Sequence, residues 1–115
     1  MLTSLLVGLA LAQEPYAHTL PEKRDKMSKA ERLEARERVT ALLTDVEQRA
    51  AQGDMAGAEP GAWMAAELAI RAFGDNDDLT MVALNDLGSV LDSTGNVEVA
   101  GQALQRSLED RKSVV

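Results

Sequence analysis

Residues 78–96, with the sequence DLTMVALNDLGSVLDSTGN, decide the fold that we expect for this chain. Their apolar residues recur three or four positions apart, which is the spacing of one face of an α-helix. Gly95 follows the last apolar residue and suits the left-handed conformation that ends many helices. The stretch therefore predicts a helix over residues 78–93 followed by a tight turn. The expected apolar face consists of Leu79, Val82, Ala83, Leu87, Val90 and Leu91.

An acidic run, Asp75-Asn76-Asp77-Asp78, comes directly before this helix. A calcium loop of the EF-hand type needs spaced ligands, a glycine at its sharp turn and a distal Glu, and the run has no such layout. Carboxylates at a helix start accept hydrogen bonds from unpaired backbone N–H groups and complement the helix dipole. We therefore interpret the run as a helix N-terminus, and the sequence predicts no metal site.

Two more helices are expected before it. Ser28-Lys29-Ala30-Glu31 is a capping box, and an apolar stripe follows it, so we expect a helix over residues 28–52 that ends at Gly53. A second helix is expected over residues 55–73, with Pro60 in its first turn, where a missing N–H costs little. The two stripes are Leu33, Val39, Leu42, Leu43, Val46 and Ala50, then Ala58, Ala62, Ala65, Ala66, Ala69 and Phe73.

A fourth helix is expected over residues 96–112, with Asn96 as its N-cap. Helix-forming residues are abundant in the chain, whereas strand-favouring aromatic and β-branched residues are sparse. Very short turns between helices force neighbouring helices to be antiparallel. The sequence therefore predicts an all-α protein built from two successive helical hairpins.

The hairpins repeat with a long period. Gly53-Asp54 and Gly95-Asn96 lie 42 residues apart, and so do Ala58 and Ala100. Residues 83–96 resemble the first helix of a tetratricopeptide repeat, and the period resembles that of the longer kinesin-light-chain subtype. The residues that carry the resemblance are Leu84, Leu87, Gly88, Leu91 and Gly95 in the first helix, and Ala100, Leu104 and Ser107 in the second.

The resemblance implies a short α-solenoid of stacked hairpins, in which the first helix of each repeat lines a concave groove for a peptide or protein partner. On the matching helix we expect Val82, Asn85, Ser89 and Asp92 to share the groove face, because they lie three or four residues apart. Asn85 would bond a partner's backbone amide, and Asp92 would pair with a basic side chain. Ordinary polar surface residues without a ligand are the alternative interpretation.

The N-terminal residues 1–12 read MLTSLLVGLALA, an apolar run shorter than the roughly 20 residues of a membrane-spanning helix. Ala10 and Ala12 fit the A-x-A cleavage pattern, so the run resembles a secretory signal peptide, although no Lys or Arg precedes it. A docked helix and an internal start of a longer chain are the alternatives. We expect residues 13–27 to be a linker and residues 28–113 to be the repeat domain. Cleavage predicts a secreted or periplasmic protein, and an uncleaved chain predicts a cytoplasmic one.

The net charge of −7 lies in the second half of the chain: residues 13–52 hold eight basic and eight acidic residues, whereas residues 53–115 hold four and eleven. An acidic half disfavours nucleic acid and anionic membranes as partners and suits a basic protein segment, with simple solubility as the alternative. The chain has no cysteine, and its one histidine, His18, lies in the linker. Because no catalytic, cofactor or phosphate-binding motif is present, we expect neither an enzyme nor a small-molecule site.

Two functional hypotheses follow. The first is a protein–protein interaction module or scaffold that presents its groove to a peptide or protein. The second is a structural piece of a longer repeat array, or a self-assembling subunit, with no groove ligand of its own. A stable stack normally needs at least three repeats and this chain has about two, so a homodimer or further repeats would complete it.

Overall fold

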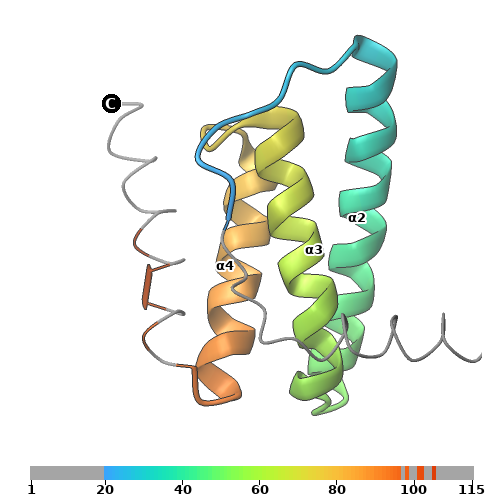
Figure 1. Cartoon of the computed structure of the whole chain (residues 1–115). Helices are drawn as coiled ribbons and strands as arrows, with labels where there is room; N and C mark the ends of the chain where they lie inside the picture. The colour runs from blue at the N-terminus through green and yellow to red at the C-terminus, as the bar shows by residue number, and fades with distance from the viewer. Residues whose placement is uncertain (1–19, 97, 99–100, 103–104, 106–115) are drawn as a thin grey trace, which may run out of the picture.

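Three α-helices make up the described part of the protein, and they pack side by side (Figure 1). The computed structural model describes residues 20–96, 98, 101–102 and 105. The helices are α2 (Lys29–Ala51), α3 (Met55–Phe73) and α4 (Asp78–Ser93), and no strand occurs within the described residues. The expected all-α character is confirmed, and the first three expected helices agree with the observed bounds to within one residue.

Each helix begins at a residue whose side chain caps it. Ser28 and Glu31 form the predicted capping box: the Glu31 N–H donates to the Ser28 hydroxyl over 3.1 Å, and the Ser28 N–H donates to the Glu31 carboxylate over 2.9 Å. Asp54 caps α3, and Asp77 caps α4 by accepting a backbone hydrogen bond over 2.8 Å. The acidic run before α4 is therefore a helix N-terminus, as predicted.

Pro60 lies in the second turn of α3, and its expected place in the first turn is wrong. Because α3 begins at Met55, an N–H at position 60 would have bonded the carbonyl of Ala56, and proline cannot donate that bond. The helix nevertheless continues through this position to Phe73. Burial of the apolar residues that follow Pro60 outweighs the lost hydrogen bond.

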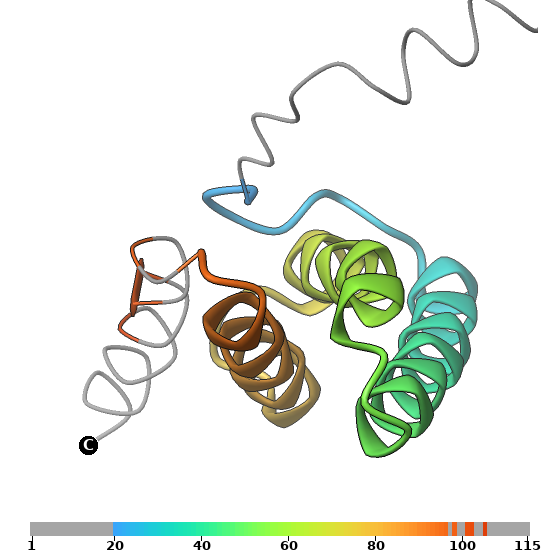
Figure 2. The same ribbon diagram turned by 90° about the horizontal axis from the view of Figure 1, so that it is seen from below.

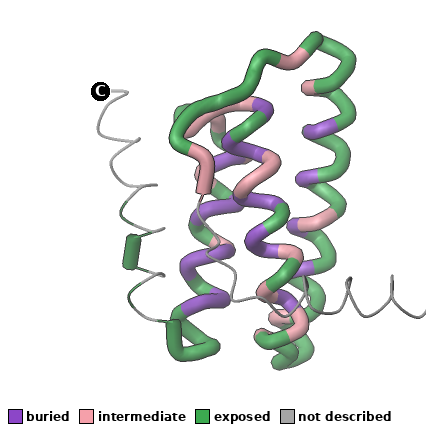
Figure 3. The backbone as a smooth tube through the Cα atoms, in the orientation of Figure 1, coloured by how far each residue is buried: buried purple, intermediate pink, exposed green. Residues whose placement is uncertain are grey.

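Helix α3 lies between α2 and α4 and supplies more buried residues than either of them. Figure 2 shows the three helices in end view as an arc with α3 at its apex, and Figure 3 shows the buried faces turned toward one another. Six alanines of α3 have no exposed surface. A Cβ added at Gly61 would lie only 3.1 Å from Val46 Cγ2 on α2, so the two helices approach closely. The largest fully buried side chains are Ile70, Leu84, Leu87, Leu91, Val39, Val46 and Thr80.

Two residues expected on apolar faces lie at the surface instead. Leu33 is 61% exposed and Val82 is 45% exposed. Around α2, Leu33 is rotated by about 120° from the fully buried Val39, which takes it off the face that packs on α3. Val82 was expected both on the buried apolar face and on the groove face. Its exposure contradicts the first expectation and is compatible with the second.

The turns that end α2 and α4 have the same hydrogen bonds, displaced by 42 residues. The Gly53 N–H donates to the carbonyl of Ala50 and the Gly95 N–H to that of Asp92, while the following residues donate to Arg49 and Leu91 over 2.8 Å in both turns. Both glycines have a positive φ, 81° and 92°. This bond pair is the Schellman motif, in which glycine avoids the steric cost of the left-handed conformation. The 42-residue sequence period therefore has a counterpart in backbone geometry.

An extended N-terminal strap, residues 20–28, crosses the outside of α3 before α2 begins (Figures 1 and 2). Leu20 packs against the core. The Asp25 N–H donates to the carbonyl of Arg71 over 2.7 Å, and the two side chains pair over 3.4 Å. Within the described part of the expected linker, Asp25 is thus attached to the last turn of α3, where helix carbonyls lack partners within the helix.

Two expectations fall on residues outside the described part of the chain. The proposed signal peptide over residues 1–12 is one of them. The fourth helix is the other, although its described residues, Glu98, Gly101, Gln102 and Gln105, have helical geometry.

The core assignment predicts a large difference between two leucines. Leu84→Ala should lower the free energy of unfolding by about 2–5 kcal/mol, because it removes a fully buried side chain and leaves a cavity. Leu33→Ala, the matched control on the surface of α2, should change it by less than about 0.5 kcal/mol. Urea unfolding followed by circular dichroism measures both. Equal effects would contradict the burial of Leu84 and the exposure of Leu33.

Candidate functional site

The four residues expected to line a groove lie together on the outward side of α4. Val82, Asn85, Ser89 and Asp92 are all exposed. Residues three and four apart share one side of a helix, and the other side of α4 is buried. We call these four residues the α4 outer face. It offers one apolar contact, an amide, a hydroxyl and a carboxylate within a single helix length.

The charge of α4 is entirely negative. Its sequence contains Asp78, Asp86 and Asp92 and no basic residue. Asp78 lies in the first turn, where a carboxylate complements the helix dipole, but Asp92 lies near the C-terminal end, where the dipole is already negative. By contrast, the last turns of α2 and α3 contain Arg49 and Arg71. The exposed end of α4 therefore has a negative potential that no residue of α4 offsets.

A carboxyl pair joins α4 to α2 beside this face. Asp86 is partly buried, and its Oδ2 atom is buried without a hydrogen-bond partner within the described part of the chain. Burial, and then the negative charge of Glu47 on α2 and a hydrogen bond with it, raise the pKa of Asp86 to about 6. The negative charge of Glu47 disfavours ionisation of Asp86, because the two carboxylates would repel each other.

Asp86 and Glu47 are the residues that sequence reasoning missed. The resemblance to tetratricopeptide repeats leads one to expect a small residue at position 47. The Glu47 side chain at this position was the sequence feature that could have pointed to the pair. Asp86 lies one position from Asn85, around the helix toward α2. Only the packing of α2 against α4 brings the two carboxyls together. Glu47 is exposed, so a cationic group of a partner that pairs with it would relieve the repulsion between the two carboxyls.

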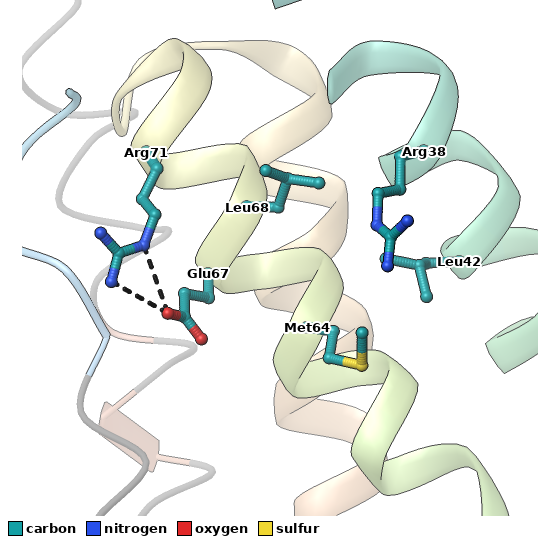
Figure 4. Close-up of a pocket in the computed structure, with 6 residues that line it drawn as sticks. All are labelled: Arg38, Leu42, Met64, Glu67, Leu68 and Arg71. Carbon is teal, nitrogen blue, oxygen red and sulfur yellow. Dashed lines mark hydrogen bonds and ion pairs between the residues drawn. The ribbon is translucent and has the colours of Figure 1, made fainter. Parts of the chain in front are cut away.

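A second surface feature lies between α2 and α3, on the outer side of α3. This pocket of about 200 Å³ is drawn in Figure 4. Leu42 and Leu68 form its apolar part, and Met64 is 46% exposed beside them. Arg71 is held away by its pairing with Glu67 over 3.0 Å. The pocket is small and open, with no convergent polar groups, so it does not have the character of a small-molecule site.

Within the described residues, no three His, Cys, Asp or Glu side chains lie close enough together to hold a metal ion. None of the described helices has the length and apolar character needed to cross a membrane.

The carboxyl pair predicts a pH-dependent stability. Because the pKa of Asp86 is higher in the folded state than in the unfolded state, the folded protein binds the extra proton between about pH 4 and about pH 6. This contribution is fully present below about pH 4 and is lost as the pH rises through about 6. At pH 8, Asp86→Asn should therefore raise the free energy of unfolding by about 1 kcal/mol, after allowance for solvent screening at a partly buried group.

Thermal unfolding at several pH values measures this effect, and 1 kcal/mol corresponds to about 5 °C in Tm. The matched control is Asp92→Asn, which removes the same charge from an exposed position on the same helix. The difference between Asp86→Asn and the unchanged protein should shrink as the pH falls to about 4. A difference that is the same at pH 4 and pH 8 would show that the pKa of Asp86 is not raised in the folded protein.

Comparison with known proteins gives no relative. No protein-family model matches the chain, and neither does any curated protein or solved structure. Its function is therefore inferred from geometry and charge.

Proposed function

We propose that this protein is a non-enzymatic interaction module of the tetratricopeptide-repeat type, and that the α4 outer face binds a basic segment of a partner protein. The observation that carries the proposal is the negative, exposed side of α4. It combines Asn85 and Asp92 with an apolar contact at Val82, and no basic residue of α4 neutralises it. Side chains of this mixture suit a Lys- or Arg-containing peptide, whose charged groups pair with carboxylates while its backbone bonds an amide.

Three features support the repeat architecture that the proposal assumes. The Schellman turns after α2 and α4 have the same bonds at a spacing of 42 residues. The small residues of α3 allow close packing on both sides, which a stack of hairpins requires. The residue Gly88 is buried on the inner side of α4, where the resemblance leads one to expect a small residue.

The carboxyl pair gives the proposed site a cation-binding centre. The unpartnered Oδ2 atom of Asp86 lies beside the α4 outer face, and Glu47 approaches it from α2. An ammonium or guanidinium group that pairs with the exposed Glu47 would offset its repulsion of Asp86, and this gain would be smaller at acidic pH, where Asp86 takes up a proton. The α4 outer face would then select for a basic residue at a defined position in the partner.

The experiment is a selection of peptides from a random display library on the immobilised protein. Affinities of the selected peptides are then measured by fluorescence anisotropy. We expect the selected peptides to be rich in Lys and Arg. Replacing both Asn85 and Asp92 by Ala should weaken their binding about tenfold or more, because a central polar contact contributes of order 1–2 kcal/mol. Helix content measured by circular dichroism should remain unchanged.

A matched double variant serves as the control. Glu37→Ala combined with Gln48→Ala removes one carboxylate and one amide from exposed positions on α2. Its affinity for the same peptides should stay within about twofold of the unchanged protein. If the two double variants bind equally well, the α4 outer face is not the site. If the selection yields no peptide, the protein has no peptide ligand on this face.

A further inference from the structure

We propose that the start of α2 and the N-terminal strap form a second docking site, which binds an acidic segment of a partner protein carrying an apolar side chain. This site differs from the α4 outer face in position and in the sign of its charge. Arg32 and Glu47 are fifteen residues apart on α2, so they are separated by about 22 Å along the helix axis.

Two adjoining clefts form the site. The larger one, of about 610 Å³, lies where the strap turns into α2 and is lined by Arg24, Asp25, Lys26, Met27, Ser28 and Arg32. The smaller one, of about 240 Å³, lies between the ends of α2 and α3 and is lined by Lys29, Arg32, Leu33, Arg36 and Phe73. Arg32 lines both clefts, so the two form a continuous surface at one end of the helix bundle.

The cations of this surface are mostly unpaired. Arg24, Lys26, Lys29 and Arg32 are not part of any ion pair formed within the described residues, whereas the arginines near the C-terminal ends of α2 and α3 are paired. Asp25 is the only carboxylate in either lining, and its charge is already engaged by Arg71. In a chain with a net charge of −7, four unpaired cations of the described residues therefore lie together at this end of α2.

The clefts are held in shape before any partner binds. The Asp25 N–H donates to the Arg71 carbonyl over 2.7 Å, which fixes the strap against the last turn of α3. The capping box between Ser28 and Glu31 fixes the point where the strap becomes helix. Because Arg24 and Lys26 extend from a fixed backbone, less conformational entropy is lost when they bind an anionic segment.

An apolar position accompanies the charges. Leu33 is an apolar side chain in the middle of a polar surface, and it is 61% exposed. Next to it in the smaller cleft, the ring of Phe73 is partly buried beneath the guanidinium of Arg36, which lies 4.4 Å from the ring centroid. An apolar side chain of the partner can contact Leu33 and Phe73 while neighbouring carboxylates pair with Lys29 and Arg32. Such an apolar contact with a charged rim is a common pattern of protein interfaces.

Charge favours a protein segment over the other anionic partners. Nucleic acid and anionic membranes present many closely spaced charges, and the acidic remainder of this chain would repel them. A short acidic segment requires contact only with the cleft. An apolar side chain of such a segment can also contact the exposed Leu33, whereas a phosphate backbone has no apolar group for this contact.

The test uses the full chain and a short fluorescein-labelled peptide of Glu and Ser with one central Leu. A matched peptide carries Gln in place of Glu. Anisotropy titrations at low and at physiological ionic strength should show binding of the acidic peptide only, weakened by salt. Arg24→Gln combined with Arg32→Gln should weaken this binding about tenfold or more. The charge-matched control, Arg38→Gln combined with Arg49→Gln, lies outside both clefts and should change it less than about threefold.

The apolar contact is tested by Leu33→Ser together with replacement of the peptide's Leu by Ser. Each change alone should weaken binding, and the second should have little further effect once the first is made. Circular dichroism of every variant confirms that the helices remain intact.

Four outcomes would overturn the proposal. One is no binding of the acidic peptide, and another is equal weakening by the two double-arginine variants. A third is tighter binding of a single-stranded oligonucleotide or of phosphatidylserine vesicles, which would assign the cleft to those ligands. The fourth is a dimer in light scattering that Arg24→Gln and Arg32→Gln together dissociate, which would make the cleft an interface between two copies. None of these depends on the α4 outer face, so the two proposals can fail separately.

Discussion

Close approach of α3 to its two neighbours is the constraint on which the rest of the structure depends. The side chains of six fully buried alanines of α3 project little from the helix, and Gly61 has none. Helices α2 and α4 can therefore pack closely against the two sides of α3. Larger side chains, among them Leu84 and Leu87, fill the spaces between the helices. The buried Thr80 hydroxyl donates to the carbonyl of Ala69 over 3.3 Å, so this contact between α4 and α3 leaves the hydroxyl satisfied.

This packing sorts charges onto separate surfaces. Because α3 occupies the centre, α2 and α4 direct their polar sides outward, and α4 has only negative charges there. The strap crosses the outside of α3 and ends at the start of α2, where it adds Arg24 and Lys26 to the cations of that helix. A chain with a large net negative charge thereby has an acidic helix face and a basic end. In the two proposals above, these surfaces of opposite charge would let one small module bridge two partners, as a scaffold does.

The contact between Asp86 and Glu47 affects both the packing of α2 on α4 and the proposed binding site. A salt bridge or an apolar pair at this junction would stabilise the packing of α2 on α4, whereas two carboxyls in contact cost free energy at neutral pH. Proteins commonly retain such unfavourable groups where a ligand compensates them. The repulsion between Asp86 and the exposed Glu47 therefore supports the proposed binding of a cationic group at Glu47.

The sequence by itself determined the all-α class, the three described helices and the glycine turns, because capping residues, helical periodicity and left-handed glycines act over only a few neighbours along the chain. It also predicted which residues of α4 share one side of the helix. Only the tertiary structure decided that Leu33 is exposed, that Asp86 meets Glu47, and that the strap lies against α3. Each of these depends on how one helix is rotated toward another, or on contacts between residues 39 to 46 positions apart, and local sequence patterns do not encode such distances.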